Sequence, residues 1–253
     1  MPNVFDGPLD RILEHEAGDL TVIVEGGLRL SALQEHLAPH GQMLALDPPG
    51  DPTIGACLAA NLSGPRRHRY GTMRDLVIGV TVVLAGGLIA SSGGKVVKNV
   101  AGYDLGKLFS GSRGRLGLIA RIALRLHPRP AASATVVADG DPRAAWAELC
   151  SSQLEPSAVD LFPGRLAILF EGPAAAVDAQ AAACPGERTD EAVWGDSADV
   201  QAAAGGREPF VWQECMLARP GPGIAFVAAA PESAWSPLAE RVRVGFDPDG
   251  ILA

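Results

Sequence analysis

The sequence is poor in cysteine, and its cysteines do not cluster. The 253 residues include only four, Cys57, Cys150, Cys184 and Cys215, and no CxxC pair occurs. Zinc ribbons and small disulfide-stabilised scaffolds need clustered cysteines, so both classes are excluded. Dispersed thiols are typical of a reducing compartment, and we expect the protein to be cytoplasmic.

Long hydrophobic runs are also missing. The longest apolar stretch, residues 76–90, has 15 residues, whereas a membrane-spanning helix needs about 20. This stretch is rich in β-branched residues and is interrupted by Gly86-Gly87, which predicts two strands joined by a tight turn. The N-terminal residues lack the basic start and apolar core of a signal peptide. We therefore expect no transmembrane segment, which leaves peripheral association with a membrane open.

Three common catalytic motifs are absent. The sequence contains no GxSxG nucleophile elbow, no GxxxxGK[ST] phosphate loop and no HExxH zinc motif. His36 and His40 do have the four-residue spacing of a metal-binding pair on a helix. Because no glutamate accompanies them, we interpret them as two surface histidines beside a helix end. We predict no metal site.

Positive charge is concentrated in one segment of an acidic chain. Residues 61–130 hold 12 of the 21 Lys and Arg residues but only two acids, Asp75 and Asp104, so this segment carries +10 while the rest carries −18. Such asymmetry predicts an anionic ligand or partner, and nucleic acid, an acidic protein and a phosphorylated cofactor all fit. The cluster from Arg66 to Tyr70 could contact nucleic-acid phosphates, with Tyr70 stacking on a base. One short cluster is a weak signal for that function.

The proline- and alanine-rich stretch 127–133 is the best domain boundary. Before it, the patterns predict a strand over 20–24, a helix capped by Ser31, the hairpin in 76–90, a short helix over 104–109 and a strand over 118–126. After it, they predict strands over 134–137, 158–162, 166–170 and 224–229, and helices over 144–150, 174–183 and 238–244. The second part reads as a small sheet with helices on one face. We therefore expect an α+β protein with domains over 1–128 and 129–253.

Glycine is abundant where the positive charge lies. Nine glycines fall in expected turns between residues 55 and 117: Gly55, Gly64, Gly71, Gly93, Gly94, Gly102, Gly111, Gly114 and Gly117. Glycine permits positive φ and leaves backbone N–H groups unobstructed, so clustered glycine loops can line an extended polyanionic ligand. The alternative is a turn-rich β domain whose glycines only serve hairpins.

Two long segments, residues 47–87 and 93–128, resemble the FAD-linked oxidases of the vanillyl-alcohol-oxidase/PCMH type. Within that family they are most similar to the FAD-binding E subunits of glycolate oxidase. The motifs Pro-Thr-Ile-Gly, Asn-x-x-Gly, Tyr-Gly, Lys-Asn-x-x-Gly-Tyr-Asp-Leu and Gly-x-Leu-Gly-x-Ile all appear in family order. The resemblance runs from about residue 9 to residue 128. It implies a PCMH-type FAD-binding domain over 1–128, followed by a smaller α+β cap-like domain over 129–253.

The resemblance also implies which residues bind the FAD cofactor. A first set would approach the pyrophosphate and ribityl chain through backbone N–H groups: Thr53, Ile54, Gly55, Ala56 and the small residues up to Asn61. Gly64, Tyr70 and Gly71 would form the next wall of the groove, and Asn99, Tyr103 and Asp104 match a motif near the flavin. Gly114, Leu116, Gly117 and Ile119 match a turn whose backbone edges the cofactor. N–H donors and nearby cations both favour a diphosphate. No catalytic base can be assigned.

The chain departs from the family pattern at four places, one of which is the missing Asn-Pro-Gly-Arg ending after Leu252. The βαβ unit with a glycine-rich pyrophosphate loop would fall before residue 1, Ala56 replaces the second glycine of Thr-Ile-Gly-Gly, and Arg115 replaces a threonine. We therefore expect an N-terminally shortened member of the family.

The function implied by the resemblance is that of an FAD-binding subunit of a 2-hydroxy-acid (glycolate) oxidase or dehydrogenase. Such an oxidoreductase acts on CH–OH groups and passes electrons from a small 2-hydroxy-acid substrate through the flavin. The expected partners are sister flavin-binding and iron–sulfur subunits, without nucleic acid. Two alternatives stay open: a degenerate, cofactor-free scaffold subunit of such a complex, and an anion- or nucleic-acid-binding module.

Overall fold

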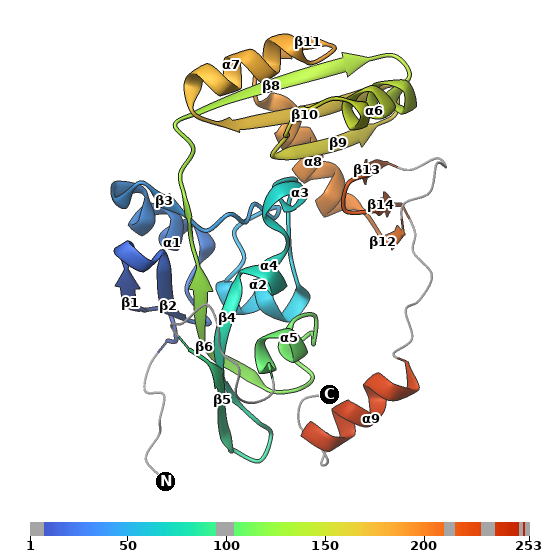
Figure 1. The fold of residues 1–253 in the computed structure, drawn as a ribbon. Coiled ribbons are helices and arrows are strands. Elements are labelled where there is room, and N and C mark those ends of the chain that lie inside the picture. The colour runs from blue at the N-terminus through green and yellow to red at the C-terminus, as the bar shows by residue number, and fades with distance from the viewer. Residues whose placement is uncertain (1–7, 95–103, 210–215, 229–235, 248–249, 251–253) are drawn as a thin grey trace.

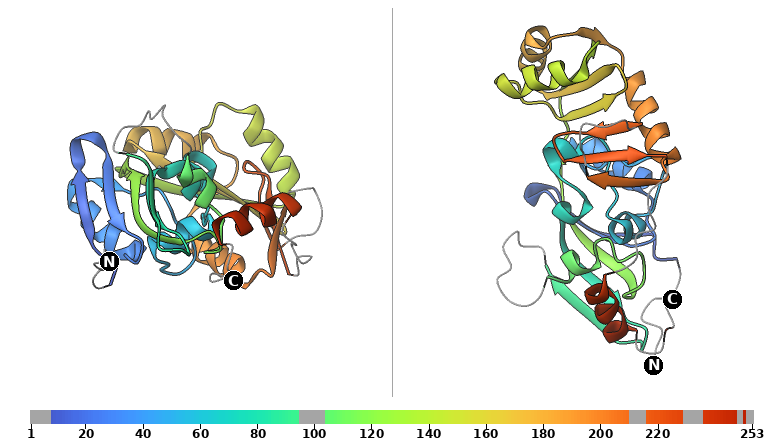
Figure 2. Two further views of the ribbon diagram at one scale, coloured as in Figure 1. Left: turned by 90° about the horizontal axis from the view of Figure 1, so that it is seen from below. Right: turned by 90° about the vertical axis from the view of Figure 1, so that its right-hand side faces the viewer.

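The protein has two parts, each built on its own antiparallel sheet (Figures 1 and 2). The computed structural model describes residues 8–94, 104–209, 216–228, 236–247 and 250. The two parts are stacked end to end, as the right-hand view of Figure 2 shows. The chain crosses from the first sheet to the second through residues 129–131. This is the α+β architecture that the sequence predicts.

The N-terminal sheet has five strands in the order β1-β2-β6-β4-β5, and the short pair β3-β7 forms a separate ribbon. In chain order the elements of this part are β1 (Ile12–Glu16), a 3-10 turn (Ala17–Asp19), β2 (Thr21–Glu25), α1 (Leu30–Leu37), a second 3-10 turn (Ala38–His40), β3 (Gln42–Met43), α2 (Ile54–Ala60), α3 (Arg67–Tyr70), α4 (Met73–Leu76), β4 (Val77–Val83), β5 (Ile89–Gly93), α5 (Leu105–Phe109), β6 (Leu118–Arg125) and β7 (His127–Pro128).

Local sequence explains several of these boundaries. Strands β4 and β5 pair as the predicted hairpin, and Gly87 in its turn has φ +77°, which glycine adopts without steric cost. Helix α2 begins after Thr53, whose hydroxyl oxygen accepts a hydrogen bond from the N–H of Ala56 at 3.2 Å. Asp104 caps α5 in the same way, accepting from the N–H of Lys107 at 3.0 Å.

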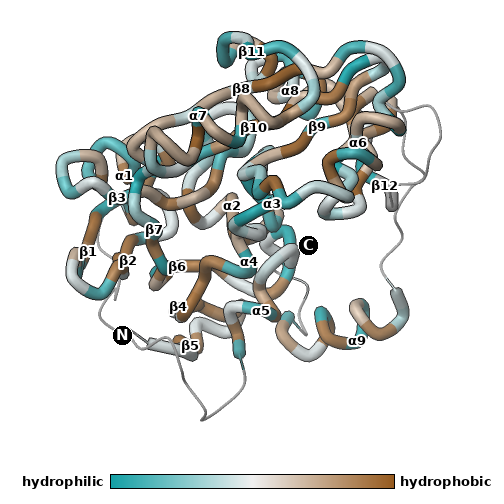
Figure 3. Tube along the Cα trace, turned by 45° about the horizontal axis from the view of Figure 1, so that its top comes forward, coloured by the Kyte–Doolittle hydropathy of each residue, from teal (hydrophilic) through white to brown (hydrophobic). Residues whose placement is uncertain are grey.

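One hydrophobic core joins the N-terminal sheet to its helices. Its members come from β2, β4 and β6 on one side and from α1 and α2 on the other, among them Val24, Val82, Ile122, Leu33, Ile54 and Leu58, all fully buried. These three strands carry much of the hydrophobic colour of the lower sheet in Figure 3. Helix α5 adds Phe109, which is also fully buried. This packing fixes the loops at the strand ends relative to one another.

The C-terminal sheet has seven strands in the order β11-β8-β10-β9-β13-β14-β12. Its elements are β8 (Ala132–Asp139), α6 (Pro142–Ser151), β9 (Ala158–Phe162), β10 (Arg165–Gly172), α7 (Ala174–Ala183), β11 (Glu187–Thr189), α8 (Ala192–Ala203), β12 (Gly206–Pro209), β13 (Leu217–Arg219) and β14 (Ile224–Val227), and α9 (Pro237–Phe246) follows. Strands β9 and β10 pair as a hairpin through the turn at Pro163-Gly164, where Gly164 has φ +78°.

Helices cover both faces of the C-terminal sheet, so the expectation of helices on one face is wrong. Leu166 and Phe170 of β10 pack in one cluster with residues of α6 and α7. The intervening Ala167 belongs to a second cluster, with Val193 of α8. Because neighbouring strand residues point to opposite faces, α8 lies on the other side of the sheet from α6 and α7.

Two further elements differ from the expectations. Ser31 does not cap α1, which begins at Leu30 after Arg29; instead its N–H and its hydroxyl each donate to the Asp51 carboxylate at 2.9 Å. Helix α9, assigned from sequence to the second domain, packs against the core of the first, with the Phe246 ring 6.0 Å from that of Phe109. Among the helices in the described ranges, none is long and apolar enough to cross a bilayer.

Candidate cofactor-binding groove

An open groove of about 380 Å³ lies on the N-terminal part where three chain segments meet. The segments are the Gly26-Gly27 loop after β2, the start of α2, and the turn that leads into β6. The lining residues are Leu9, Gly26, Gly27, Thr53, Gly55, Ala56, Ala59, Gly114, Gly117, Leu118 and Ile119.

Backbone hydrogen bonds hold the three segments together. The N–H of Gly26 donates to the carbonyl of Ala120 at 2.9 Å, and the N–H of Gly55 donates to the carbonyl of Gly26 at 2.7 Å. Such close approach requires glycine, because a Cβ on Gly26 would collide with the carbonyl oxygen of Ile119, and one on Gly55 would lie 2.7 Å from that of Gly26. The backbone packing of the fold therefore forms the groove.

Six of the residues predicted from sequence line this groove: Thr53, Gly55, Ala56, Gly114, Gly117 and Ile119. Ala59, one of the small residues up to Asn61 that the resemblance also implied, lines the groove as well, whereas sequence reasoning missed Leu9, Gly26, Gly27 and Leu118. The available signal was Gly26-Gly27, a glycine pair directly after the predicted strand over 20–24. Leu9 is brought to the groove by tertiary structure, since it follows no motif of its own.

Four other predicted residues serve packing or helix capping and do not line the groove. The side chains of Ile54 and Leu116 are buried in the core. Asn61 ends α2 with φ +46°, and its side-chain oxygen accepts from the N–H of Arg74 at 3.1 Å. Gly64 is packed so closely against the carbonyl of Asp47 that a Cβ would collide with it. None of these four lines the groove.

The remaining predicted residues lie elsewhere. Gly71 ends α3 with φ +82°, and Asp104 caps α5. The Tyr70 ring lies 4.9 Å from that of His127 of β7 in an edge-on contact. Asn99 and Tyr103 fall outside the described residues. Their proposed role near the flavin therefore stays a prediction.

The chemical character of the groove differs from the expectation of free backbone donors. The N–H groups of Ile54 and Gly55 donate to the carbonyls of Leu28 and Gly26, and that of Ala56 donates to the Thr53 hydroxyl. The lining consists mainly of glycine, alanine and aliphatic side chains. A groove of this composition fits a flat or extended carbon-rich part of a ligand better than a diphosphate.

The basic cluster at α3 faces the C-terminal part. The Arg66 guanidinium donates to the Glu171 carboxylate, with Nη2 to Oε1 at 2.7 Å, and the Glu171 side chain is 1% exposed. Arg69 Nη1 donates to the carbonyl of Glu171 at 3.2 Å and to the Ser157 hydroxyl at 3.3 Å. Part of the positive charge of residues 61–130 thus finds its anionic partner inside this molecule.

Asp47 completes this junction between the two parts. Its carboxylate accepts from the backbone N–H of Arg66 at 3.2 Å. Burial raises the pKa of Asp47 to about 6, and the Arg66 charge opposes that rise. In α3, burial lowers the pKa of Arg67 to about 10, with further lowering from the charges of Arg219 and Arg207. Cations are therefore concentrated at the junction.

Comparison with known proteins defines the class. Residues 4–93 match the family model described as an FAD-binding domain. This part of the chain is an FAD-binding domain of the PCMH type. Alkyldihydroxyacetonephosphate synthase has a similar fold, with a TM-score of 0.61 and 20% identity over 75% of this chain and 44% of that chain.

Among curated proteins, the relatives include glycolate oxidase subunits and D-lactate dehydrogenases. Glycolate oxidase subunit GlcE of Escherichia coli is 34% identical over 189 residues, which are 72% of this chain and 54% of that protein. The mitochondrial D-lactate dehydrogenase [cytochrome] 1 of Saccharomyces cerevisiae is 31% identical over 203 residues, 80% of this chain and 33% of that protein. The chain thus spans between a third and about half of the length of these relatives.

Proposed function

We propose that this chain is the FAD-binding subunit of a 2-hydroxy-acid oxidase or dehydrogenase, with glycolate as the first substrate to test. The observation that carries the proposal is the groove, where three distant segments bring six residues of the FAD-family motifs together. The relatives support the substrate class, because glycolate and D-lactate, which their names contain, are both 2-hydroxy acids.

Each part of the structure has a role in this proposal. Small residues along the groove let a flat ring system or ribityl chain lie against the backbone. Bound FAD would supply the hydride-accepting chemistry, and Thr53, Gly55 and Ala56 with the turn before β6 would hold it in place. Arg67 of α3, a half-buried cation close to Arg207, favours an anionic group such as the substrate carboxylate.

The proposal extends to partners and location. Relatives named as glycolate oxidase subunits support an assembly with sister flavin-binding and iron–sulfur subunits. The dispersed cysteines favour the cytoplasm. A second candidate, a cofactor-free scaffold subunit, is favoured by one observation: the N–H groups of Ile54, Gly55 and Ala56 are already used within the protein.

FAD titration of two matched variants tests the groove. Ala56 is an exposed helical alanine inside the groove, and Ala175 is an exposed helical alanine on α7 of the C-terminal part. Ala56→Glu places a charged chain against the cofactor, and we expect it to weaken FAD binding at least tenfold, about 1.4 kcal/mol. Ala175→Glu should bind FAD like the wild type. Equal FAD affinity of Ala56→Glu and the wild type would contradict the assignment of this groove.

Reduction of the bound flavin tests the substrate class. In the complex reconstituted with its sister subunits, glycolate or D-lactate should bleach the flavin absorbance under anaerobic conditions. A complex that assembles with this chain but holds no flavin on it would support the scaffold candidate instead. A flavin that neither hydroxy acid reduces would contradict the substrate class while leaving FAD binding intact.

A further inference from the structure

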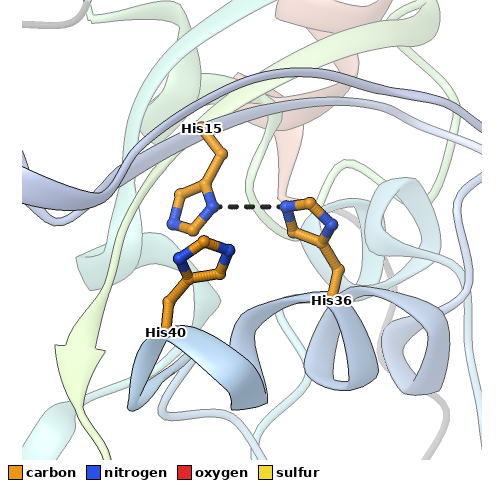
Figure 4. Close-up of side chains that lie close together, drawn as sticks. All are labelled: His15, His36 and His40. Carbon is orange, nitrogen blue, oxygen red and sulfur yellow. Dashed lines mark hydrogen bonds between the residues drawn. The ribbon is translucent and has the colours of Figure 1, made fainter.

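Three of the five histidines of the chain meet at one place on the surface. His15 comes from β1, His36 from α1 and His40 from the 3-10 turn that follows α1, and the three rings face one another (Figure 4). One nitrogen from each ring lies within 4.8 Å of the others. The sequence predicted only the spacing of His36 and His40; strand β1 adds the third ring.

The hydrogen bonds around His15 fix which of its nitrogens is free to bind. Gln42 is buried, and its side-chain NH₂ donates to the carbonyl of Ala17 at 2.7 Å, which turns its carbonyl oxygen toward His15. That oxygen lies 2.9 Å from His15 Nε2. Nε2 must therefore carry the proton, so Nδ1 has a lone pair. A buried partner that orients a histidine in this way is typical of metal ligands.

The lone pair on His15 Nδ1 points at the neighbouring histidines. His15 Nδ1 lies 3.2 Å from His36 Nε2. In a tetrahedral zinc site with Zn–N bonds of about 2.0–2.1 Å, two ligand nitrogens are about 3.4 Å apart. His15 Nδ1 and His36 Nε2 are therefore already spaced like two zinc ligands. Rotation of the exposed His40 side chain brings the third nitrogen into the same geometry. We propose that His15, His36 and His40 form a binding site for a divalent transition-metal ion of the zinc type, with the fourth position open to water.

The surrounding structure supports this site in two ways. Leu33 and Leu37 of α1 are fully buried and hold the helix in place, while His15 pairs with Val22 in the β1–β2 ladder. Binding then requires only that His36 carry its hydrogen on Nδ1.

The site is separate from the FAD groove. His15 is paired with Val22, four residues before Gly26, and four residues of extended strand span about 13 Å. No described acidic or cysteine side chain joins the cluster. Its occupancy can therefore be tested without reference to flavin.

Titration of Zn²⁺ into the full chain, prepared without a histidine tag, tests the proposal by calorimetry. The exposed thiol Cys150 is replaced by serine throughout, so that it cannot compete. We expect one Zn²⁺ per chain, at least a tenfold loss of affinity in His15→Ala, His36→Ala and His40→Ala, and about a tenfold loss in Gln42→Leu, which removes the orienting oxygen. Circular dichroism checks that each variant is folded.

Glu35→Gln is the matched control, because Glu35 is an exposed neighbour of His36 on α1 that lies outside the cluster. It should bind Zn²⁺ like the parent chain. A Co²⁺ derivative should show a tetrahedral spectrum without a thiolate charge-transfer band. The proposal is overturned if the parent chain binds no Zn²⁺, or if the triple histidine-to-alanine variant binds it with the parent affinity.

Discussion

The buried ion pair between Arg219 and Asp160 gives the sharpest test of the packing of the C-terminal part. Arg219 on β13 and Asp160 on β9 have side chains that are 1% and 0% exposed, with Nε and Oδ1 2.9 Å apart. Ser197 of α8 donates to the same carboxylate, and Arg219 Nη2 donates to its hydroxyl at 3.2 Å. The Phe226 ring lies 4.9 Å from the guanidinium. The network therefore ties α8 to two strands.

The perturbation is Asp160→Asn, which removes the negative charge at nearly constant volume. The guanidinium then stays buried with neutral partners only, and breaking such a pair costs about 3–5 kcal/mol. That is a large fraction of a typical unfolding free energy of about 5–15 kcal/mol. Replacing both charges, in the double variant Asp160→Leu with Arg219→Met, removes the unpaired charge and should cost much less than the single substitution.

The assay is urea unfolding followed by tryptophan fluorescence, since Trp146 and Trp194 both pack in the C-terminal part. Asp196→Asn is the control, because its ion pair with Arg165 is exposed, at 58% and 37%, and such pairs contribute about 0–1 kcal/mol. If Asp160→Asn destabilises the protein no more than Asp196→Asn does, the reasoning about this network is refuted.

Three further predictions concern the junction and the groove. Arg66→Met should lower the free energy of unfolding by about 2 kcal/mol and expose the chain near residues 129–131 to limited proteolysis, because the buried Glu171 carboxylate loses its charged donor. The Asp47 carboxyl binds protons more tightly in the folded than in the unfolded chain, so its stabilising effect is present at low pH and is lost as the pH rises to about 6. Relative to the wild type, Asp47→Asn should therefore gain about 2 kcal/mol of stability between pH 4 and pH 7, measured by urea unfolding. Gly117→Ala should weaken both stability and FAD affinity, because Gly117 has φ +149° and a Cβ there would lie 2.6 Å from the Val83 carbonyl oxygen.

Each of these has an outcome that contradicts it. An unchanged proteolysis pattern for Arg66→Met would show that this ion pair does not hold the two parts together. Parallel pH profiles for Asp47→Asn and the wild type would show that Asp47 has an ordinary pKa. Wild-type stability of Gly117→Ala would show that the turn before β6 can relax.

Features determined by local chemistry could be predicted from the sequence. The β4–β5 hairpin follows from β-branched runs around Gly86-Gly87. The short helix predicted over 104–109 is α5, which Asp104 caps. In each case the residues that specify the element lie within a few positions of it.

Features that depend on tertiary contacts could not be predicted. Helix α8 presents only Val193 and Ser197 as buried residues among alanines and polar residues, so its sequence shows no apolar period. Ser31 resembles a helix cap, but Asp51 from another loop takes both of its donors. His15 has no metal-binding spacing to any other residue until β1 is placed beside α1.

The flavin content of the full chain tests the central claim most directly. The chain is purified alone and together with its sister subunits, saturated with FAD, and freed of unbound cofactor by gel filtration before its absorbance is measured. The account predicts about one FAD per chain in the wild type and a clear loss in Ala56→Glu, with Ala175→Glu unchanged. A chain that retains no FAD in either preparation would contradict it.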